Sequence, residues 1–444
     1  MPPFKIKENK KQKFITFLPL IVVELYLAVT LILYQFGPYP WPTKKPQLFW
    51  MLIFLYHIAF IVGYCFCMKS RYIERNTVNL NQFMVKFVKL ILIVNIFITL
   101  VTIVRDFSLT SISLSDIFER FIFGIKDPDA TYKYKIETVN NAAYGGKLMT
   151  IFLLVSSFVP ALAIPMGLIY FRKIGLAFQV LFLVNVGLEI VHYVGIGTNI
   201  GIFNLCITFI VILGLKLVSF LYHKKIDRRK LWLAIAVLFV LLLLFLFFFN
   251  KTIGSRLAGD AWLQYSVGGI YPTVDCELYQ FVPESLYKPI AMLTMYLTQG
   301  YYAMSMALEL PWIPMFGVGG EMFLQNYIDE FVNVSQFSYA ERLASFGWHP
   351  TVNWHSLYLW VANDLSFFGV ILFMLVLGYF FAYFYRSSLK SKNSLSMVIF
   401  ISLCTMVLFI PANNQIFGFL MPCLKFLFLI AFYIIFCKTQ KAVK

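Results

Sequence analysis

The stretch LWLAIAVLFVLLLLFLFFF, residues 231–249, decides the class of fold because it contains no charged residue. An apolar run of this length crosses the hydrocarbon core of a bilayer as a helix. The rest of the chain agrees, since 60% of its 444 residues are hydrophobic and only 13% are charged, about half the charged share of a soluble protein. The sequence therefore excludes a soluble fold and predicts a polytopic membrane protein.

Apolar runs of about 20 residues predict ten transmembrane helices in an all-α fold. They cover residues 15–36, 48–68, 83–104, 148–171, 174–195, 200–222, 231–250, 365–385, 394–411 and 416–437. The chain then divides into a membrane domain over 1–250, which includes a first long loop at 105–147, a large loop over 251–355 and a second membrane domain over 356–444.

The formal net charge of +16 is distributed unevenly along the chain. Of the 37 Lys and Arg, 21 lie in the two termini and in alternate short loops, whereas the intervening short loops hold only Lys44 and Lys45. The positive-inside rule then places both termini in the cytoplasm and both long loops outside. The segments placed outside, Lys44 and Lys45 included, carry 15 acidic and 12 basic residues, which argues against a nucleic-acid partner there.

The large loop contains one more long apolar segment, at 289–310. Its polar residues Thr294, Thr298, Ser305 and Glu309 fall on one face of a helix. This pattern predicts an amphipathic helix that lies along the outer interface or re-enters the membrane. An eleventh span, which would invert the topology of everything after it, is the alternative.

Two short patterns suggest binding sites but favour turns. The run from Gly317 to Gly320 (GVGG) lacks the lysine and the spacing of nucleotide-binding loops. Asp127 and Asp129 flank a proline and look like a two-carboxylate metal site, yet Asp-Pro-Asp is also ordinary turn chemistry. We therefore expect neither a metal nor a cofactor.

The end of the large loop is more informative, because it holds the only two histidines of the outer loops. In order along the chain it contains Arg342, Trp348, His349, Asn353, Trp354 and His355. Trp and His rings stack on sugars, Asn bonds hydroxyls, and Arg pairs with phosphate through two nitrogens. The same residue types also anchor loops at a membrane surface, so the sequence leaves both interpretations open.

Here the chain resembles the oligosaccharide repeat-unit polymerases of the Wzy type. The resemblance covers residues 289–378 and rests on short motifs: Tyr296-Leu297-Thr298-Gln299-Gly300-Tyr301-Tyr302-Ala303, Thr351-Val352-Asn353, Leu357-Tyr358-Leu359-Trp360 and Asp364-Leu365-Ser366-Phe367-Phe368-Gly369. Elsewhere only the topology is similar. The chain departs from the family in lacking an outer Arg-x10-Gly pair, which leaves the essential arginine open.

The resemblance implies a metal-independent glycosyltransferase of the cytoplasmic membrane, with an architecture compatible with the GT-C type. Such an enzyme moves a growing glycan from undecaprenyl pyrophosphate onto a sugar hydroxyl of the next lipid-linked repeat unit, and makes O antigen, capsule or exopolysaccharide. A chain-length regulator and a flippase are the implied protein partners. The chemistry needs a cation for the departing diphosphate and a base for the hydroxyl.

Few outer residues have these properties. As catalytic residues we predict His349, Arg342, Glu277 and His355, and as substrate-binding residues Arg256, Asn353, Trp348, Trp354, Tyr301 and Asp364. Arginine suits a diphosphate because its planar fork stays charged. Histidine suits the base because it titrates near neutral pH.

Ionisable residues inside the spans give further hypotheses. Glu24 and Lys425 could pair between the first and last spans. Glu189 and His192 lie three residues apart and could line a cavity floor or make an ordinary hydrogen bond between helices.

Two other functions stay open. One is a ligase-type or other lipid-linked glycosyltransferase, and the other is a glycan-lipid flippase or transporter. Transporters are usually built from two related halves. The arrangement of seven spans, a large loop and three spans argues against that plan.

Overall fold

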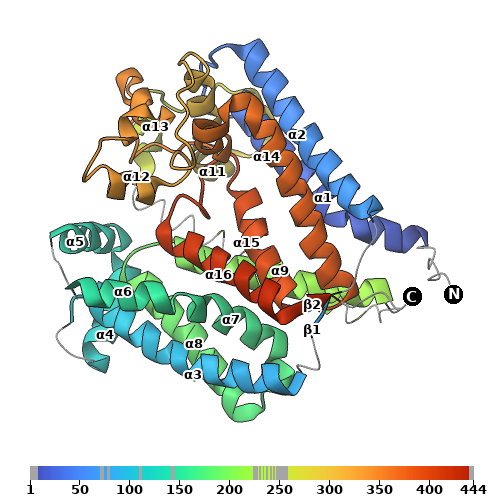
Figure 1. The fold of residues 1–444 in the computed structure, drawn as a ribbon. Helices are drawn as coiled ribbons and strands as arrows, with labels where there is room; N and C mark the ends of the chain where they lie inside the picture. Colours follow the sequence, from blue (N-terminus) through green and yellow to red (C-terminus); the bar gives the residue numbers. More distant parts are fainter. Residues whose placement is uncertain are drawn as a thin grey trace.

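The computed structural model of the chain describes residues 9–70, 75–77, 81–109, 113–141, 146–223 and 259–439, with isolated positions between 229 and 246. The described part is mostly helical, and its only strands are two of three residues each, β1 (Arg75–Thr77) and β2 (Cys437–Thr439). Figure 1 shows two groups of long helices, with α1, α2 and α14 in one and α3, α7 and α8 in the other, and with α9, α15 and α16 between them.

Seven segments in the described part are long and apolar enough to cross a membrane. They are α1 (Lys10–Phe36), α2 (Pro46–Lys69), α3 (Asn81–Asp106), α6 (Gly146–Ser156) continued by α7 (Phe158–Tyr170) and η1 (Phe171–Lys173), α8 (Leu176–Gly195), α9 (Ile200–His223) and α14 (Leu357–Lys390). The apolar helices α15 (Ser394–Leu408) and α16 (Leu420–Phe436) are shorter. The prediction of a multi-pass membrane protein is confirmed.

Each predicted span except 231–250 corresponds to one of these helices, and 231–250 lies largely outside the described residues. The total of ten spans therefore stays a prediction. The remaining elements, in chain order, are α4 (Leu114–Lys126), α5 (Pro128–Asn141), η2 (Gly259–Gln264), η3 (Glu277–Phe281), η4 (Glu284–Leu286), α11 (Tyr287–Ala307), α12 (Met322–Ile328), η5 (Ser335–Phe337), α13 (Tyr339–Arg342) and η6 (Leu343–Phe346).

Segments that the charge pattern places in the cytoplasm gather at one end of the bundle (Figure 1). The Gln12 side chain at the start of α1 donates to the carbonyl of Tyr222 near the end of α9, at 3.3 Å. Arg386 near the end of α14 donates to the carbonyl of Cys67 near the end of α2, at 2.8 Å. β1 pairs antiparallel with β2. Which face of the membrane this end meets stays a prediction.

Segments predicted to lie outside meet at the opposite end. The backbone N–H of Thr273 donates to the carbonyl of Pro38 in the loop between α1 and α2, at 2.8 Å. The N–H of Leu357 donates to the carbonyl of Ile410 in the loop between α15 and α16, at 2.9 Å. These contacts join segments that the lysine and arginine pattern assigns to the same side, and the topology itself stays a prediction.

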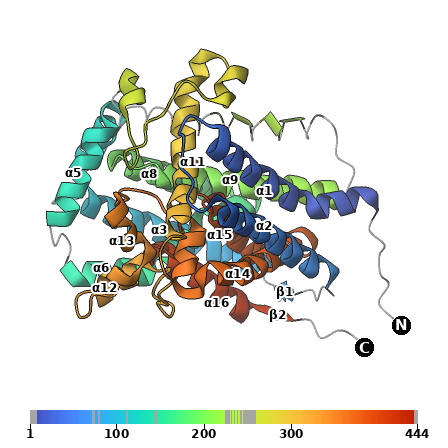
Figure 2. The same cartoon turned by 90° about the horizontal axis from the view of Figure 1, so that it is seen from above.

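The predicted amphipathic helix is α11, and its polar stripe faces protein. Thr298 and Ser305 are completely buried. Trp41 Nε1 donates to Thr298 Oγ1 at 2.8 Å, and the backbone N–H of Lys44 donates to Ser305 Oγ at 3.2 Å. Figure 2 shows α11 running across the direction of α1 and α2, and α11 is not among the seven candidate spans. The loop between α1 and α2 thus covers this part of the stripe, whereas Glu309 is exposed, and the position of α11 along the interface or within the membrane stays a prediction.

The helices α2 and α14 approach each other closely at two glycines. A Cβ atom built on Gly63 would lie 1.9 Å from the carbonyl oxygen of Leu375, and one built on Gly378 would lie 2.2 Å from that of Phe60. Small residues allow backbones to come this near in a membrane, where dispersion and polar contacts replace the hydrophobic effect.

We expect Gly63→Ala to destabilise the protein by about 1–3 kcal/mol, because the added methyl group meets backbone that cannot move without separating the two helices. The measurement is thermal unfolding of the detergent-solubilised protein. Gly214→Ala on α9 is the matched control, since its Cβ would meet no atom of the described residues within 4 Å. Equal melting temperatures for the two variants would contradict this account of the contact.

Candidate functional site

Residues 259–356 form a layer of short helices and irregular chain at the predicted outer end, which we call the cap. Figure 1 shows α11, α12 and α13 together at this end, beside the start of α14. All predicted catalytic residues, and all predicted binding residues except Arg256 and Asp364, fall in the cap. Arg256 lies outside the described residues.

The aromatic residues predicted to bind sugar mostly join the cap to the helices. Trp348 is buried, and its ring meets those of Trp41 and Tyr302 edge-on, at centroid distances of 6.2 and 5.4 Å. Trp354 is half-buried with its ring 4.9 Å from that of Tyr296. Tyr301 is completely buried, and its hydroxyl lies 3.0 Å from that of Thr30. The two most buried rings, Trp348 and Tyr301, offer little surface to a ligand.

The two predicted histidines have opposite surroundings. His349 is exposed, and its backbone N–H donates to Asn353 Oδ1 at 2.7 Å, so Asn353 holds the turn that presents the ring. His355 is 1% exposed, and its Nε2 atom is buried without a hydrogen-bond partner among the described residues. Burial lowers the pKa of His355 to about 3, only partly opposed by a hydrogen bond with the backbone of Asn353. His355 is therefore neutral at physiological pH.

Arg342 is held against the segment that begins at Pro311. Its Nη2 donates to the carbonyl of Pro311 at 2.7 Å, and the guanidinium lies over the ring of Tyr339, 5.3 Å from the centroid. Its Nη1 is buried and has no hydrogen-bond partner among the described residues. Glu277, by contrast, is exposed at the start of η3.

Asp364 binds the backbone of the glycine-rich loop that the sequence marks as a turn. Its Oδ1 accepts from the N–H groups of Gly317 and Gly319, at 2.7 and 3.0 Å, and its Oδ2 accepts from that of Gly320 at 3.0 Å. Consecutive backbone N–H groups of this kind form a natural anion site. Because the carboxylate of Asp364 already fills that site, the prediction of a turn rather than a phosphate loop is confirmed, and Asp364 fixes the loop.

Glu321 follows this loop directly. It is a candidate functional residue that was not among those predicted from the sequence. It is half-buried, and its Oε2 atom is buried without a hydrogen-bond partner in the part of the chain that the structure describes. Burial raises the pKa of Glu321 to about 7, a hydrogen bond with Cys423 of α16 opposes the shift, and the nearby charge of Asp364 adds to it. A carboxyl group with a pKa near neutrality can take up and release protons at physiological pH.

The structure therefore brings part of the predicted set together on one segment, residues 311–321. Arg342 holds its first residue and Asp364 its glycines, and Glu321 ends it. The aromatic residues pack elsewhere in the cap. No sequence motif marks Glu321, and the only signal is its position directly after two glycines.

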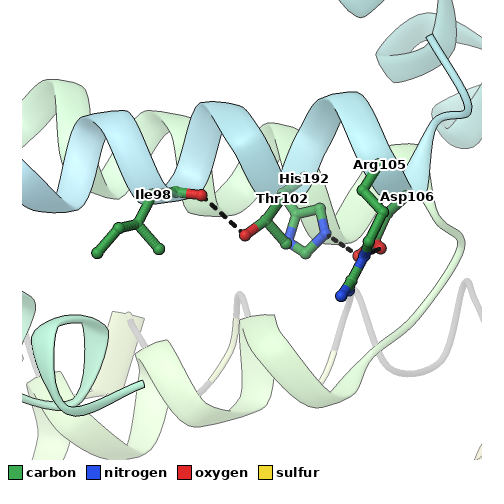
Figure 3. A network of polar contacts seen from close by, with 5 residues as sticks. All are labelled: Ile98, Thr102, Arg105, Asp106 and His192. Atoms are coloured by element: carbon green, nitrogen blue, oxygen red, sulfur yellow. Dashed lines mark hydrogen bonds and ion pairs between the residues drawn. The ribbon is translucent and has the colours of Figure 1, made fainter. Parts of the chain in front are cut away.

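Glu24 and His192, two of the ionisable residues that the sequence places in spans, each form a pair. Glu24 Oε2 lies 2.6 Å from His57 Nδ1, so the suggested pair of Glu24 with Lys425 is wrong. His192 of α8 lies 2.8 Å from Asp106 at the end of α3, and Asp106 accepts from Arg105 Nε at 2.7 Å (Figure 3). His192 thus makes a contact between helices that holds the C-terminal end of α8 against α3.

The Asp-Pro-Asp pattern starts a helix. Asp127 Oδ1 accepts from the N–H of Ala130 at 3.0 Å, and Asp129 pairs with Lys133 at 2.7 Å within α5. In the part of the chain that the structure describes, no three His, Cys, Asp or Glu side chains gather closely enough to hold a metal ion. Comparison of the chain with protein-family models, with curated proteins and with solved structures gives no match.

Proposed function

We propose that the protein is an oligosaccharide repeat-unit polymerase that joins lipid-linked glycans at the outer face of the cytoplasmic membrane. The observation that carries the proposal is the carboxyl group of Glu321, which is half-buried in the cap of a multi-pass membrane protein and has a pKa of about 7. The resemblance of residues 289–378 to such polymerases supports the same reaction.

In the proposed reaction, a sugar hydroxyl oxygen of the acceptor attacks the anomeric carbon of the growing chain. The bond from that carbon to the diphosphate oxygen breaks, and its electron pair leaves with the lipid diphosphate. The hydroxyl proton passes to a base, whose best pKa lies near the operating pH. We assign this role to Glu321, with the exposed ring of His349 as the alternative base.

Arg342 is the proposed cation for the leaving diphosphate. One nitrogen of its guanidinium is anchored on Pro311, and Nη1 has no hydrogen-bond partner among the described residues. An anchored guanidinium that still has a nitrogen to donate is preorganised for the negative charge that develops on a departing phosphate oxygen.

Large exposed rings give the cap a surface for sugar. They include Trp312 (45% exposed), Phe316 (89%), Tyr327 (64%), Phe331 (76%) and Phe346 (48%). Exposed apolar groups that lie near one another on a protein surface mark binding sites more often than chance. Trp312 and Phe316 belong to the same 311–321 segment as Glu321, and this supports a glycan held beside the base.

The direct test is reconstitution of the purified protein in liposomes with one lipid-diphosphate-linked repeat unit. We expect a ladder of lipid-linked products whose sizes differ by one unit. If the glycan is instead transferred to an acceptor without lipid diphosphate, the protein is a ligase-type enzyme and the proposal is wrong. Movement of the lipid across the bilayer without any new glycosidic bond would replace it with a flippase.

The proposal also requires that the cap face outward. Ser285 is exposed in the cap, and Lys392 is exposed near the opposite end of α14. In a Cys276→Ser background, we expect a membrane-impermeant maleimide to label Ser285→Cys in spheroplasts and to label Lys392→Cys only after lysis. The reverse pattern would contradict both the topology and the proposed function.

A further inference from the structure

A cavity of about 180 Å³ lies among α7, α8, α9, α15 and α16. It far exceeds the ~10–15 Å³ that one water molecule needs by this measure. Its wall combines apolar side chains with polar ones, which include Glu189, Asn204, Thr208, Ser402, Thr405 and Lys425. A polar cavity among apolar helices calls for a ligand.

Two opposite charges face this cavity without meeting. Lys425 of α16 and Glu189 of α8 both line it and are close enough to interact electrostatically. No ion pair joins them, and neither makes a hydrogen bond within the described part of the chain. Charged groups inside a membrane protein are costly unless they are paired, and they mark functional sites. The two groups are therefore positioned for a ligand that carries both charges.

The depth of the cavity matches the headgroup region of a bilayer. Glu189 lies six residues before the end of α8 at Gly195, and Lys425 lies five residues after the start of α16 at Leu420. At a rise of about 1.5 Å per residue, both lie roughly 8–9 Å below the helix ends. The interfacial region on each side of a bilayer is about 5–8 Å thick. The cavity thus lies near the boundary between headgroups and acyl chains.

We propose that this cavity binds the zwitterionic headgroup of a phosphoethanolamine lipid, with its phosphate at Lys425 and its ammonium at Glu189. The site is separate from Glu321 and Arg342, and the proposal stands whether or not the protein polymerises glycans. The amide of Asn204 and the hydroxyl of Thr208, which also line the cavity, are placed to bond the remaining phosphate and ester oxygens.

The pair of charges selects among lipids by a simple rule. An anionic phosphoglycerol lipid satisfies Lys425 but is repelled by Glu189. A phosphocholine lipid carries both charges, but its quaternary ammonium has no N–H to donate to the carboxylate. A lipid diphosphate brings still more negative charge against Glu189. Only the phosphoethanolamine headgroup pairs both charges with hydrogen bonds.

The test is lipid binding by the purified protein after delipidation, followed by native mass spectrometry. Phosphoethanolamine, phosphoglycerol, phosphocholine and undecaprenyl-diphosphate lipids are offered in equal amounts. We expect the wild type to prefer phosphoethanolamine lipid about tenfold, the difference that one charge-assisted hydrogen bond makes. Lys425→Met should remove this binding, and Glu189→Gln should bind phosphoglycerol lipid at least as well as phosphoethanolamine lipid. Free phosphoethanolamine should not displace the lipid.

Lys216→Met on α9 and Glu24→Gln on α1 are the matched controls, because both remove a charge from a span and neither residue lines the cavity. Lys425→Arg, which keeps the charge, should retain binding. If Lys425→Met fails to fold, Glu189→Gln alone decides, since its expected result is a change of preference rather than a loss. Unchanged selectivity in Glu189→Gln, or a wild type that prefers phosphoglycerol or diphosphate lipid, would overturn the proposal.

Discussion

Glu321→Gln is expected to lower the rate of glycan polymerisation by about 10²–10⁴-fold, the usual contribution of a general base. Glutamine has the same shape but cannot accept the hydroxyl proton. In the wild type, kcat/KM should fall as the pH drops below about 7, because the carboxyl group then carries a proton. The variant should lack this decrease. The assay is the glycan ladder made by reconstituted protein, measured across pH.

Stability provides the control for this variant. The pKa of Glu321 in the folded protein, about 7, lies above its ordinary value of 4.5. Ionisation therefore weakens the fold as the pH rises from about 4.5 to 7, and the uncharged glutamine should be at least as stable as the wild type above pH 7. Glu330→Gln, at an exposed carboxylate of the cap, should keep full activity. A complete ladder from Glu321→Gln, with none from His349→Ala, would transfer the role of base to His349.

Arg342→Ala is expected to cost on the order of 3 kcal/mol in transition-state stabilisation, about a hundredfold in rate. The more informative change is Arg342→Lys. Lysine keeps the positive charge and can still donate to the carbonyl of Pro311, but it cannot also present the second nitrogen that Nη1 supplies. If Arg342 acts on the leaving diphosphate, the lysine variant should lose most of the activity while it keeps its melting temperature.

Arg120→Ala is the matched control for Arg342, because Arg120 also stacks on a tyrosine in a predicted outer loop, with the guanidinium 4.1 Å from the ring centroid of Tyr134. It should leave the ladder intact. Full activity in Arg342→Lys would show that Arg342 only fastens the 311–321 segment, and the search for the cation would then move to Arg256.

The membrane helices were predictable because a run of about 20 apolar residues is stable mainly as a helix within the lipid bilayer. The partners of those helices were not. Nothing in the local sequence of α2 indicates that Gly63 lies against Leu375, since the two are more than 300 residues apart. The polar stripe of α11 was visible in its periodicity, but the sequence could not show that the loop between α1 and α2 folds over it.

The candidate site divides in the same way. Arg342 and His349 stand out because outer arginines and histidines are scarce, and scarcity can be read from a sequence. The pKa of Glu321 depends on burial and on Cys423 and Asp364, which are distant along the chain. Asp364 was predicted as a binding residue from a resemblance, and its contacts with three glycine N–H groups appear only in three dimensions.

The close packing of α2 on α14 also constrains how the protein is made. Roughly 290 residues separate Lys69 from Leu357, so at about 5–20 residues per second a ribosome delivers α14 about 15–60 s after α2. During that interval the groove at Gly63 has no native occupant. The face of α2 around Gly63 therefore stays exposed to lipid, insertion factors and membrane proteases until the last quarter of the chain is synthesised.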